Sequence, residues 1–307
     1  MENLTFALIT PSYAPDFQRC KLLCWSIKKF VCPLVKHYII VDRQDFELFQ
    51  ELADSNTTIL VKEKILPAWI KRIPLPTKKN LWLNFKGFSS GSWLIRGWLV
   101  QQIIKLAAAQ YTSQDILLFI DSDVAFIDRF NVHEMVQARG EVRLFRVPDA
   151  AEVENKVSKK WKDTAKALLG LPQKEYYDNY VSQIVTWRRD NLIRLYQAIE
   201  VQTGRYWVEA LSQIKDLSEY VLYGMFVSYV LQDISGHYDE HTMKLCHSYW
   251  SNKAMPDETL AAFFQEAVRS EHRAVMISAK SPTAVSILQF QQLVETARAR
   301  AQAHQIS

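Results

Sequence analysis

The chain lacks several features that mark specialised classes of protein. No stretch of its 307 residues approaches the roughly 18 uninterrupted apolar residues of a membrane-spanning helix. No block of like charge resembles a nucleic-acid-binding arm, because the 37 basic and 33 acidic residues are spread along the chain and leave a formal charge of +4. We therefore expect no transmembrane segment and no nucleic-acid partner.

Cysteine is also scarce, and its pattern indicates neither a zinc site nor a disulfide framework. The four cysteines stand at positions 20, 24, 32 and 246, without a CxxC pair or regular spacing. The first residues, MENLTFALITPSY, enter a strand pattern without the cationic start, long apolar core and small-residue cleavage site of a signal peptide. Both observations predict a cytoplasmic protein.

No linker rich in Gly, Ser or Pro divides the chain, and no internal repeat or low-complexity tract is present. With 49% hydrophobic residues the chain can bury a substantial core. We expect a single domain over residues 1–307. Its first half, residues 1–130, ends at the motif DSD, and residues 131–307 form the second half.

The order of the predicted elements indicates an α/β fold. Apolar runs rich in β-branched residues predict strands near 4–10, 36–42, 57–63 and 115–124, separated by segments with helical spacing. This alternation is typical of a mostly parallel sheet flanked by helices. Residues 64–92 predict an irregular segment. Later predictions are strands over 141–147 and 272–278, a strand running into a helix over 179–204, and helices over 154–170, 217–232, 255–270 and from about 285.

Two aspartates follow the fourth predicted strand, in the stretch ILLFIDSDV. Ligands of open parallel sheets bind at the carboxyl ends of the strands, which is where Asp121 and Asp123 are expected. Residues two apart on an extended chain project to the same side, so the two carboxylates should converge. Convergence would raise their pKa values unless a cation shared the region. Mg²⁺ or Mn²⁺, with oxygen ligands from carboxylates and phosphates, is the natural occupant.

The same pair admits two other interpretations. Asp121 can cap a turn after the strand while Asp123 is solvated. Phosphatases of the haloacid dehalogenase type also place Asp-x-Asp after an apolar strand, the first Asp as nucleophile and the second as acid–base group. Such phosphatases carry the motif on their first strand, whereas three predicted strands precede it here, and no convincing acidic pair follows on a later strand end.

The segments TPSY (10–13), DSDV (121–124) and SEYVLYG (218–224) resemble a bacterial group of glycosyltransferase-like proteins of the GT-A type, and the resemblance covers most of the chain. GT-A enzymes transfer a sugar from a nucleoside diphosphate donor, whose diphosphate chelates a metal held by an Asp-x-Asp motif. The resemblance implies a GT-A (Rossmann-like) fold with additional C-terminal helices, and Mn²⁺ or Mg²⁺ as cofactor.

The resemblance also implies roles for individual residues. Those expected to bind the nucleotide sugar are Thr10, Pro11, Ser12, Tyr13, Arg19, Asp42, Arg96, Gln101, Asp121, Ser122 and Gln183. The expected metal ligands are Asp121, Asp123 and His247, with His237, Asp239 and His241 as alternatives to His247. Ordinary turns remain open for Pro11 and Tyr13, and an N-cap for Asp42. Lys105 shares a helix face with Gln101, and we expect that face to be solvated.

Glu219 is the candidate catalytic base. It lies in a segment otherwise built of apolar and aromatic residues, where a carboxylate needs a partner or a task. In inverting enzymes of the GT-A type, a carboxylate at about this point takes the proton from the acceptor hydroxyl. Ser218 and Glu219 can equally serve as cap and first-turn anion of a helix. Among the tryptophans, Trp93 is the candidate for stacking on a sugar ring.

Together these implications predict a hexosyltransferase-like enzyme that transfers a sugar to a hydroxyl of a glycan or lipid-linked glycan, as in surface polysaccharide synthesis. Peripheral contact with a membrane is left open. One alternative is a phosphohydrolase of the haloacid dehalogenase type with Asp121 as nucleophile. The other is a non-catalytic subunit that binds sugar nucleotides or glycans.

Overall fold

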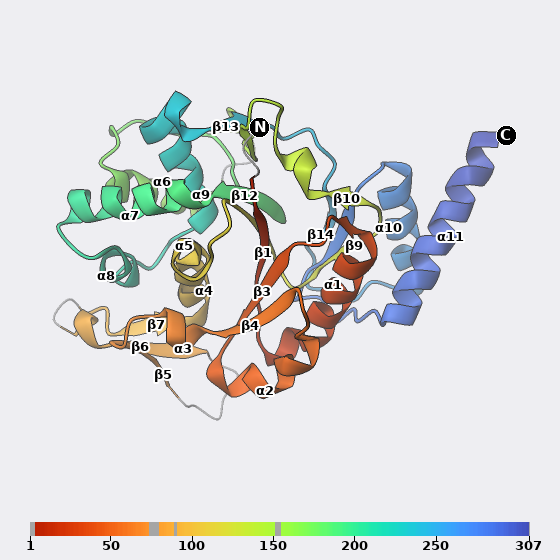
Figure 1. Cartoon of the computed structure of the whole chain (residues 1–307), viewed down its shortest axis with the longest axis horizontal. Helices are drawn as coiled ribbons and strands as arrows, with labels where there is room; N and C mark the ends of the chain where they lie inside the picture. The colour runs from red at the N-terminus through yellow and green to blue at the C-terminus, as the bar shows by residue number, and fades with distance from the viewer. Residues whose placement is uncertain (1–3, 74–79, 89–90, 151–154, 307) are drawn as a thin grey trace.

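A five-stranded sheet with the order β12-β8-β1-β3-β4 forms the centre of the molecule (Figure 1). The structure is a computed structural model that describes residues 4–73, 80–88, 91–150 and 155–306, with side chains up to residue 302. The parallel strands are β1 (Phe6–Pro11), β3 (Lys36–Val41), β4 (Thr57–Val61) and β8 (Ile116–Ile120). Strand β12 (Ile184–Arg188) runs antiparallel beside β8. The predicted mixed α/β fold with a mostly parallel sheet is confirmed.

The two faces of the sheet pack against different helices. Along β1, Phe6 and Leu8 belong to one core cluster, which includes Leu23 of α1 (Phe17–Phe30). Ala7 and Ile9 belong to another, which includes Leu99 of α4 (Gly97–Leu106). All residues of β1 and β8 are buried, because helices cover both faces of these central strands. This double burial explains the continuous apolar runs in the sequence.

The remaining helices are α2 (Phe46–Phe49), α3 (Lys62–Ile65), α5 (Ala108–Tyr111), α6 (Lys156–Leu169), α7 (Arg189–Thr203), α8 (Trp207–Ser212), α9 (Glu219–Met225), α10 (Asp257–Arg269) and α11 (Ile287–Ile306). Short strands pair as β2 (Val31–Cys32) with β10 (Phe130–Asn131) and β11 (Val142–Leu144) with β13 (His237–Asp239). The predicted helix over 217–232 is α9 continued by a π-helical turn over Phe226–Leu231. In the part of the chain that the structure describes, no helix is both long and apolar enough to cross a membrane.

A small antiparallel sheet stands where an irregular segment was predicted. It consists of β5 (Ile70–Arg72), β6 (Leu81–Asn84) and β7 (Leu94–Arg96). Residues 74–79 and 89–90 of the predicted segment lie outside the described residues. Trp82 and Ile95 are cross-strand partners and almost fully buried, so this sheet has an inner apolar face. The prediction of irregular structure over 64–92 is therefore wrong for β5 and β6, and β7 lies just after that segment, where helical spacing was expected.

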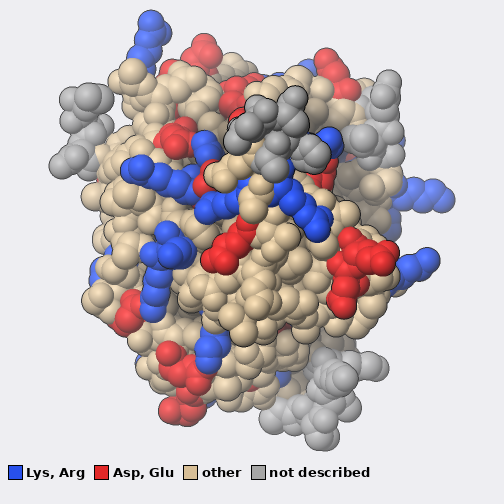
Figure 2. All heavy atoms as spheres, turned by 90° about the vertical axis from the view of Figure 1, so that its right-hand side faces the viewer, with Lys and Arg blue, Asp and Glu red and all other residues tan. Residues whose placement is uncertain are grey.

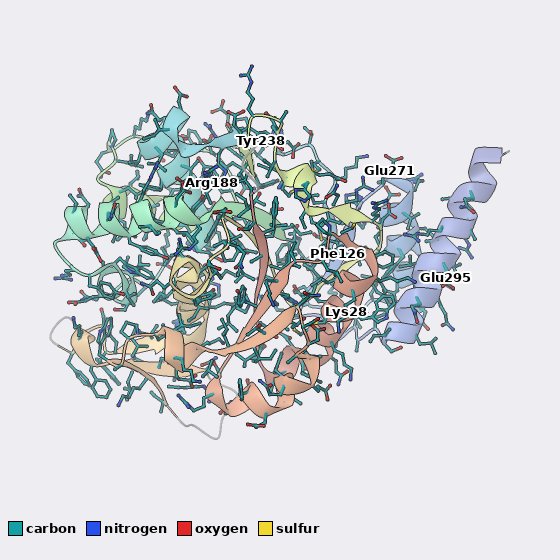
Figure 3. All side chains as sticks on the ribbon, in the orientation of Figure 1. Lys28, Phe126, Arg188, Tyr238, Glu271 and Glu295 are labelled. Carbon is teal, nitrogen blue, oxygen red and sulfur yellow. The ribbon has the colours of Figure 1, made fainter. Side chains whose placement is uncertain are left out.

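A second small sheet begins immediately after the DSD motif. Its order is β14-β15-β9, formed by Cys246–Tyr249, Ala274–Ile277 and Val124–Phe126. Phe264 of α10 and Phe290 of α11 share a buried cluster with residues of β9 and β15. Figure 3 shows Phe126 inside the molecule and Glu295 of α11 at its edge. Residues late in the chain therefore pair directly with the strand that follows the two aspartates.

Candidate functional site

Polar side chains gather at one edge of the central sheet. Since β1, β3 and β8 are parallel, their carboxyl ends meet at this edge, and they are followed by Ser12, Asp42 and Asp121. Strand β12 runs the other way, and its first residue pairs with the last residue of β8. Gln183, which precedes β12, is therefore at the same edge. This is the edge where open parallel sheets bind their ligands.

Asp121 and Asp123 lie in a tight turn and not on an extended chain as predicted. The carbonyl oxygen of Asp121 accepts a hydrogen bond from the Val124 amide at 3.1 Å, so the chain reverses directly into β9. The Asp121 side chain is 38% exposed. Burial, and then the charge of Asp121, raise the pKa of Asp123 to about 6. The two carboxylates therefore act on one another despite the different backbone geometry.

A third carboxylate, which the sequence did not indicate, faces the same region. Asp16 lies just before α1 and is 7% exposed. Its pKa is raised by burial and by the charge of Asp121, against the opposing effect of Arg19. Asp16 also contributes to the raised pKa of Asp123. The only available sequence signal was an acidic residue a few positions after the end of β1.

The carboxylates offer the chemistry of a hard cation site, but an incomplete one. Among the described residues, no group of three or more His, Cys, Asp or Glu side chains is arranged to hold a metal ion. Asp121 and Asp123 still supply carboxylate oxygens in a region where negative charge is unfavourable, as the raised pKa of Asp123 shows. Mg²⁺ and Mn²⁺ accept such ligands and commonly complete their shell with water and substrate phosphates. The residues therefore fit a divalent ion that shares its ligands with a bound substrate.

Lys105 is the cation at the centre of the site. Its Nζ lies 2.8 Å from Asp121 Oδ1, 3.0 Å from Glu219 Oε1 and 2.7 Å from the hydroxyl of Tyr220. Only 2% of the Lys105 side chain is exposed. Burial alone would lower its pKa, but Asp121, Tyr220 and Glu219 raise the pKa well above its usual value. The predicted solvated face is wrong for Lys105, which is a buried ammonium bridging two carboxylates.

The carboxylate of Glu219 is enclosed. Only 2% of its side chain is exposed, and burial raises its pKa against the lowering effect of Lys105. Ser218 caps α9 by accepting a hydrogen bond from Val221, and the Glu219 amide donates to Gln102 Oε1 at 3.1 Å. The cap and first-turn interpretation is thus confirmed for the start of α9. In this arrangement Glu219 contacts Lys105 and does not face open solvent.

Asp42 is also fully engaged. Its side chain is 1% exposed and lies 2.9 Å from Lys62 Nζ and 3.3 Å from Arg72 Nε. Asn80 donates a further hydrogen bond to Asp42 at 3.3 Å, and Lys62 also reaches the carbonyl oxygen of Ser12. Asp42 stands at the N-cap position of the turn that follows β3, but its side chain makes no capping hydrogen bond there. The ion pairs therefore fix this carboxylate beside the end of β1.

Arg19 points to a late segment of the chain. Its guanidinium donates to the carbonyl oxygen of Ser281 at 2.8 Å and lies 3.5 Å from Asp16. The same segment supplies the amide of Ala279, which donates to Asp123 Oδ2 at 2.9 Å. We call residues 278–283 the strap. The structure thus brings Arg19 close to the acidic residues but commits its guanidinium to the strap.

The structure does not bring His247 to Asp121 and Asp123. The ring of His247 packs on Phe263, with ring centres 4.6 Å apart, and against His272. The neighbouring residue, Cys246, is the one on which the charge of Asp123 acts. Burial and, more weakly, the negative charge of Asp123 raise the pKa of the Cys246 thiol to about 12. Side chains alternate along a strand, so His247 on β14 faces away from the acidic pair. The physical arrangement corrects the expectation of His247 as third ligand.

The other predicted binding residues have varied surroundings. Pro11 ends β1, and the hydroxyl of Thr10 is hydrogen-bonded to the His37 ring at 2.9 Å. Tyr13 is 41% exposed, and burial and then Asp16 raise its pKa. Ser122 is buried, Gln101 and Gln183 are half-buried, and Arg96 is exposed. On α4, the glutamine that contacts α9 is Gln102, the neighbour of the predicted Gln101.

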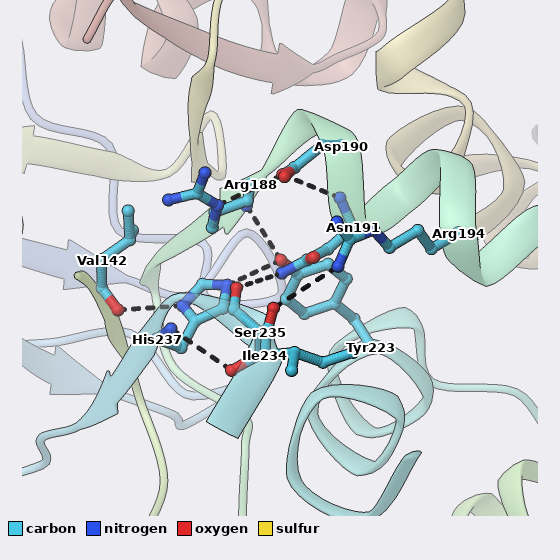
Figure 4. A network of polar contacts seen from close by, with 9 residues as sticks. All are labelled: Val142, Arg188, Asp190, Asn191, Arg194, Tyr223, Ile234, Ser235 and His237. Carbon is cyan, nitrogen blue, oxygen red and sulfur yellow. Dashed lines mark hydrogen bonds and ion pairs between the residues drawn. The ribbon is translucent and has the colours of Figure 1, made fainter. Parts of the chain in front are cut away.

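Away from this edge, His237 sits in a polar network at the end of β12 (Figure 4). Its Nδ1 lies 2.9 Å from the carbonyl oxygen of Val142, which can only accept, so Nδ1 carries the proton. The Tyr223 hydroxyl donates to His237 Nε2 at 2.8 Å and accepts from the Arg188 amide. Both ring nitrogens are used by the neutral imidazole, and burial lowers the pKa of His237 to about 4. Arg188 marks the opposite end of β12 from the acidic edge.

This lowered pKa predicts a pH-dependent stability. As the pH falls from 6.5 toward 4, the unfolded chain takes up a proton on residue 237 that the folded chain does not, so the free energy of unfolding should fall in that window. The loss is expected to be roughly 3 kcal/mol at most. Denaturant unfolding of the protein and of His237→Gln at several pH values measures it, because carboxylate contributions cancel in the difference. His241→Gln, at an exposed histidine, is the control. A difference between wild type and His237→Gln that stays the same at pH 7.5 and pH 5 would contradict the assignment.

Comparison with known proteins gives a family and shows structural likeness to solved proteins. A family model with the description "Family of unknown function (DUF6492)" matches residues 4–301. No curated protein matches the chain. Among solved structures, the chain is similar to the apo crystal structure of mouse xyloside xylosyltransferase 1, with a TM-score of 0.45 and 8% sequence identity. That match covers 92% of this chain and 100% of the other. At a TM-score below 0.5 it carries no argument about activity.

Proposed function

The chain belongs to the DUF6492 family, whose description assigns no activity, and we propose from the site itself that it is a metal-dependent glycosyltransferase of the GT-A type. The observation that carries the proposal is the position of Asp121 and Asp123 at the carboxyl edge of a parallel sheet, beside the polar residues that follow β1 and β3. The donor would be a nucleoside diphosphate sugar, and the acceptor a hydroxyl of a glycan or lipid-linked glycan.

Asp121 and Asp123 would hold Mn²⁺ or Mg²⁺ together with the donor diphosphate. When bound, the metal supplies positive charge that stabilises the departing diphosphate. Lys105 donates to Asp121 Oδ1, and the Ala279 amide donates to Asp123 Oδ2. Both carboxylates are thereby oriented before any ligand arrives, which avoids the cost of ordering them on binding.

Glu219 fits a positioning role better than that of a base. A base must reach the acceptor hydroxyl directly or through one water, and the enclosed carboxylate of Glu219 instead contacts Lys105 at 3.0 Å. Glu219 holds the Lys105 ammonium in place and keeps it charged, and this ammonium contacts Asp121. Asp42 is equally enclosed and would also act by positioning, because it pairs with Lys62, which reaches the carbonyl oxygen of Ser12 at the end of β1.

Thermal unfolding with a panel of donors tests the proposal. UDP-, GDP-, CMP- and TDP-sugars are added with and without Mn²⁺, and one of the diphosphate donors is expected to raise Tm only in the presence of metal. Ligand at 100 times its Kd should add about 2.7 kcal/mol of stability. A matched sample of Asp121→Asn should lose the metal-dependent part. If no donor changes Tm with metal present, the proposal fails. Binding without donor hydrolysis or transfer would favour a non-catalytic sugar-nucleotide subunit.

Two observations favour a second candidate, a phosphohydrolase with Asp121 as nucleophile. The pKa of Asp123 near 6 suits an acid–base group, and Lys105 contacts the carboxylate of the would-be nucleophile. This enzyme would form an aspartyl-phosphate on Asp121, which mass spectrometry of the protein after reaction with a phosphomonoester detects. A covalent phosphate that disappears in Asp121→Asn would replace the glycosyltransferase proposal.

A further inference from the structure

The small sheet of β5, β6 and β7 has an outer face that is apolar and basic. Lys71, Leu83 and Leu94 are cross-strand partners and therefore lie on the same face. Lys71 and Leu94 are exposed, whereas Trp82 and Ile95, which alternate with them, are buried. Figure 1 places this sheet at the margin of the molecule, on the side opposite α11. In the part of the chain that the structure describes, the C-terminal helix α11 therefore does not cover this sheet.

Beyond the end of β6, Phe85 lies beside Lys71 and is followed by further exposed aromatic side chains. Phe85, Phe88 and Trp93 are 48%, 57% and 45% exposed. The rings of Phe88 and Trp93 are stacked, with centres 6.2 Å apart and planes 9° from parallel, and Phe85 lies 6.0 Å from Phe88. We call Lys71, Phe85, Phe88, Trp93 and Leu94 the aromatic patch. Contiguous exposed apolar residues of this kind mark interaction surfaces on soluble proteins.

The charge of the surrounding chain is strongly positive. Residues 62–100 contain eight Lys or Arg and a single acidic residue, Glu63, a net charge of +7, whereas the whole chain carries +4. Lys62 and Arg72 pair with Asp42, and Lys86 pairs with Glu209, so the positive charge that a partner would meet is smaller than +7. Lys71 Nζ lies 6.0 Å above the Phe85 ring, so a positive charge sits directly beside the exposed aromatic side chains. By contrast, acidic and basic side chains are interspersed on the face formed around α11 (Figure 2).

We propose that the aromatic patch binds the surface of membranes that contain anionic lipids. Aromatic side chains favour the boundary between headgroups and acyl chains, and Lys and Arg favour anionic headgroups. An apolar face with a basic surround is the composition of peripheral membrane-binding surfaces. The complementary charge of the membrane is what identifies the occupant, because a neutral partner would gain nothing from the concentration of positive charge.

A glycan is less compatible with this surface. Sugar-binding aromatics need neighbouring polar groups to hydrogen-bond the hydroxyls. Among the described polar residues next to the aromatic patch, buried Asn84 donates its amide nitrogen to the Ser92 carbonyl oxygen and the Ser212 hydroxyl, and the Ser92 hydroxyl donates to the Gln213 carbonyl oxygen. The exposed members of the patch are apolar or cationic. This arrangement also reassigns Trp93, which the sequence indicated as a sugar-stacking residue, to the membrane-binding surface.

Co-sedimentation of the full chain with vesicles tests the proposal. Binding to phosphatidylcholine vesicles containing phosphatidylglycerol is expected to exceed binding to pure phosphatidylcholine, and to weaken as salt rises. The double variant Phe88→Ser/Trp93→Ser should bind anionic vesicles roughly tenfold more weakly, since two interfacial side chains are lost. Val201→Ser and Ile234→Ser remove apolar side chains that are 87% and 72% exposed elsewhere, and should bind as the wild type does.

Fluorescence locates the contact. Lipids with brominated acyl chains should quench part of the tryptophan emission of the wild type, and Trp93→Phe should lose most of that quenching while Trp98→Phe retains it. The proposal is overturned if the wild type fails to bind anionic vesicles, or if the double variant binds them as well as the wild type. It is also overturned if a soluble glycan changes the tryptophan emission and brominated lipids do not. None of these measurements uses a sugar donor, so their outcome is independent of the proposed transferase activity.

Discussion

Replacement of Lys105 by Met is expected to lower the free energy of unfolding by roughly 3–5 kcal/mol, because it leaves a buried carboxylate without its counter-charge. The Glu219 side chain is 2% exposed, and Lys105 is its ion-pair partner at 3.0 Å. Met has a similar length and apolar stem, so the change removes the charge with little change in packing. Denaturant unfolding at neutral pH measures the loss.

The double variant Lys105→Met/Glu219→Gln separates the charge effect from a packing effect. With the carboxylate neutralised, much of the lost stability should return, although the hydrogen bond from Lys105 to Tyr220 stays absent. The variant Glu219→Gln alone should be destabilised less than Lys105→Met, because Asp121 and Tyr220 still accompany the ammonium. A Lys105→Met protein within 1 kcal/mol of the wild type would show that water or a movement of α9 solvates Glu219.

Substitution of Asp123 by Asn is expected to separate function from stability. Metal-dependent donor turnover should fall by about 10²–10³-fold, since charge stabilisation by a metal is worth several kcal/mol and each 1.36 kcal/mol is tenfold. Stability at pH 7.5 should stay equal or rise. Burial and Asp121 raise the pKa of Asp123 to about 6, so its ionised form is unfavourable in the folded protein and Asn removes that cost. Asn can still accept the hydrogen bond from the Ala279 amide.

Steady-state turnover and Tm, measured on the same preparations, check this pair of effects. Asp216→Asn provides the control, because Asp216 forms an exposed pair with Lys160 of α6 and its replacement should change neither quantity. Turnover within threefold of the wild type would remove Asp123 from the site. A clear fall in Tm would instead give Asp123 a structural role in holding the strap.

The sequence predicts the central fold well because its signals there are local. Apolar runs identify β1, β3 and β8, and burial of every residue in β8 leaves its run ILLFI without a polar residue. The position of the DSD motif at a strand end follows from the same pattern. The β5–β7 sheet was missed, since its short strands lie in a segment rich in turn-forming residues.

Other features of the site depend on contacts that no local pattern contains. Lys105 resembles a solvated residue of α4, and its partner Glu219 lies on α9, more than a hundred positions later. Asp16 lies near Asp121 because the turn after β1 folds toward the end of β8. The side chain of His247 lies on the face of β14 that packs on Phe263, away from the acidic pair. A shift of one residue along a strand moves a side chain to the other face of the sheet. The sequence of this short strand has no clear alternation and does not predict which face His247 takes.

The strap has a consequence for how the protein can be divided. Strand β9, which directly follows the acidic turn, is paired with β15, and the Ala279 amide is bonded to Asp123. Shortened versions that end before residue 279 would therefore alter the acidic turn itself, even though they leave every residue of the DSD motif in place. For fragment complementation, fusion or truncation, the natural unit is one that keeps the final strand and the strap together with the first 130 residues.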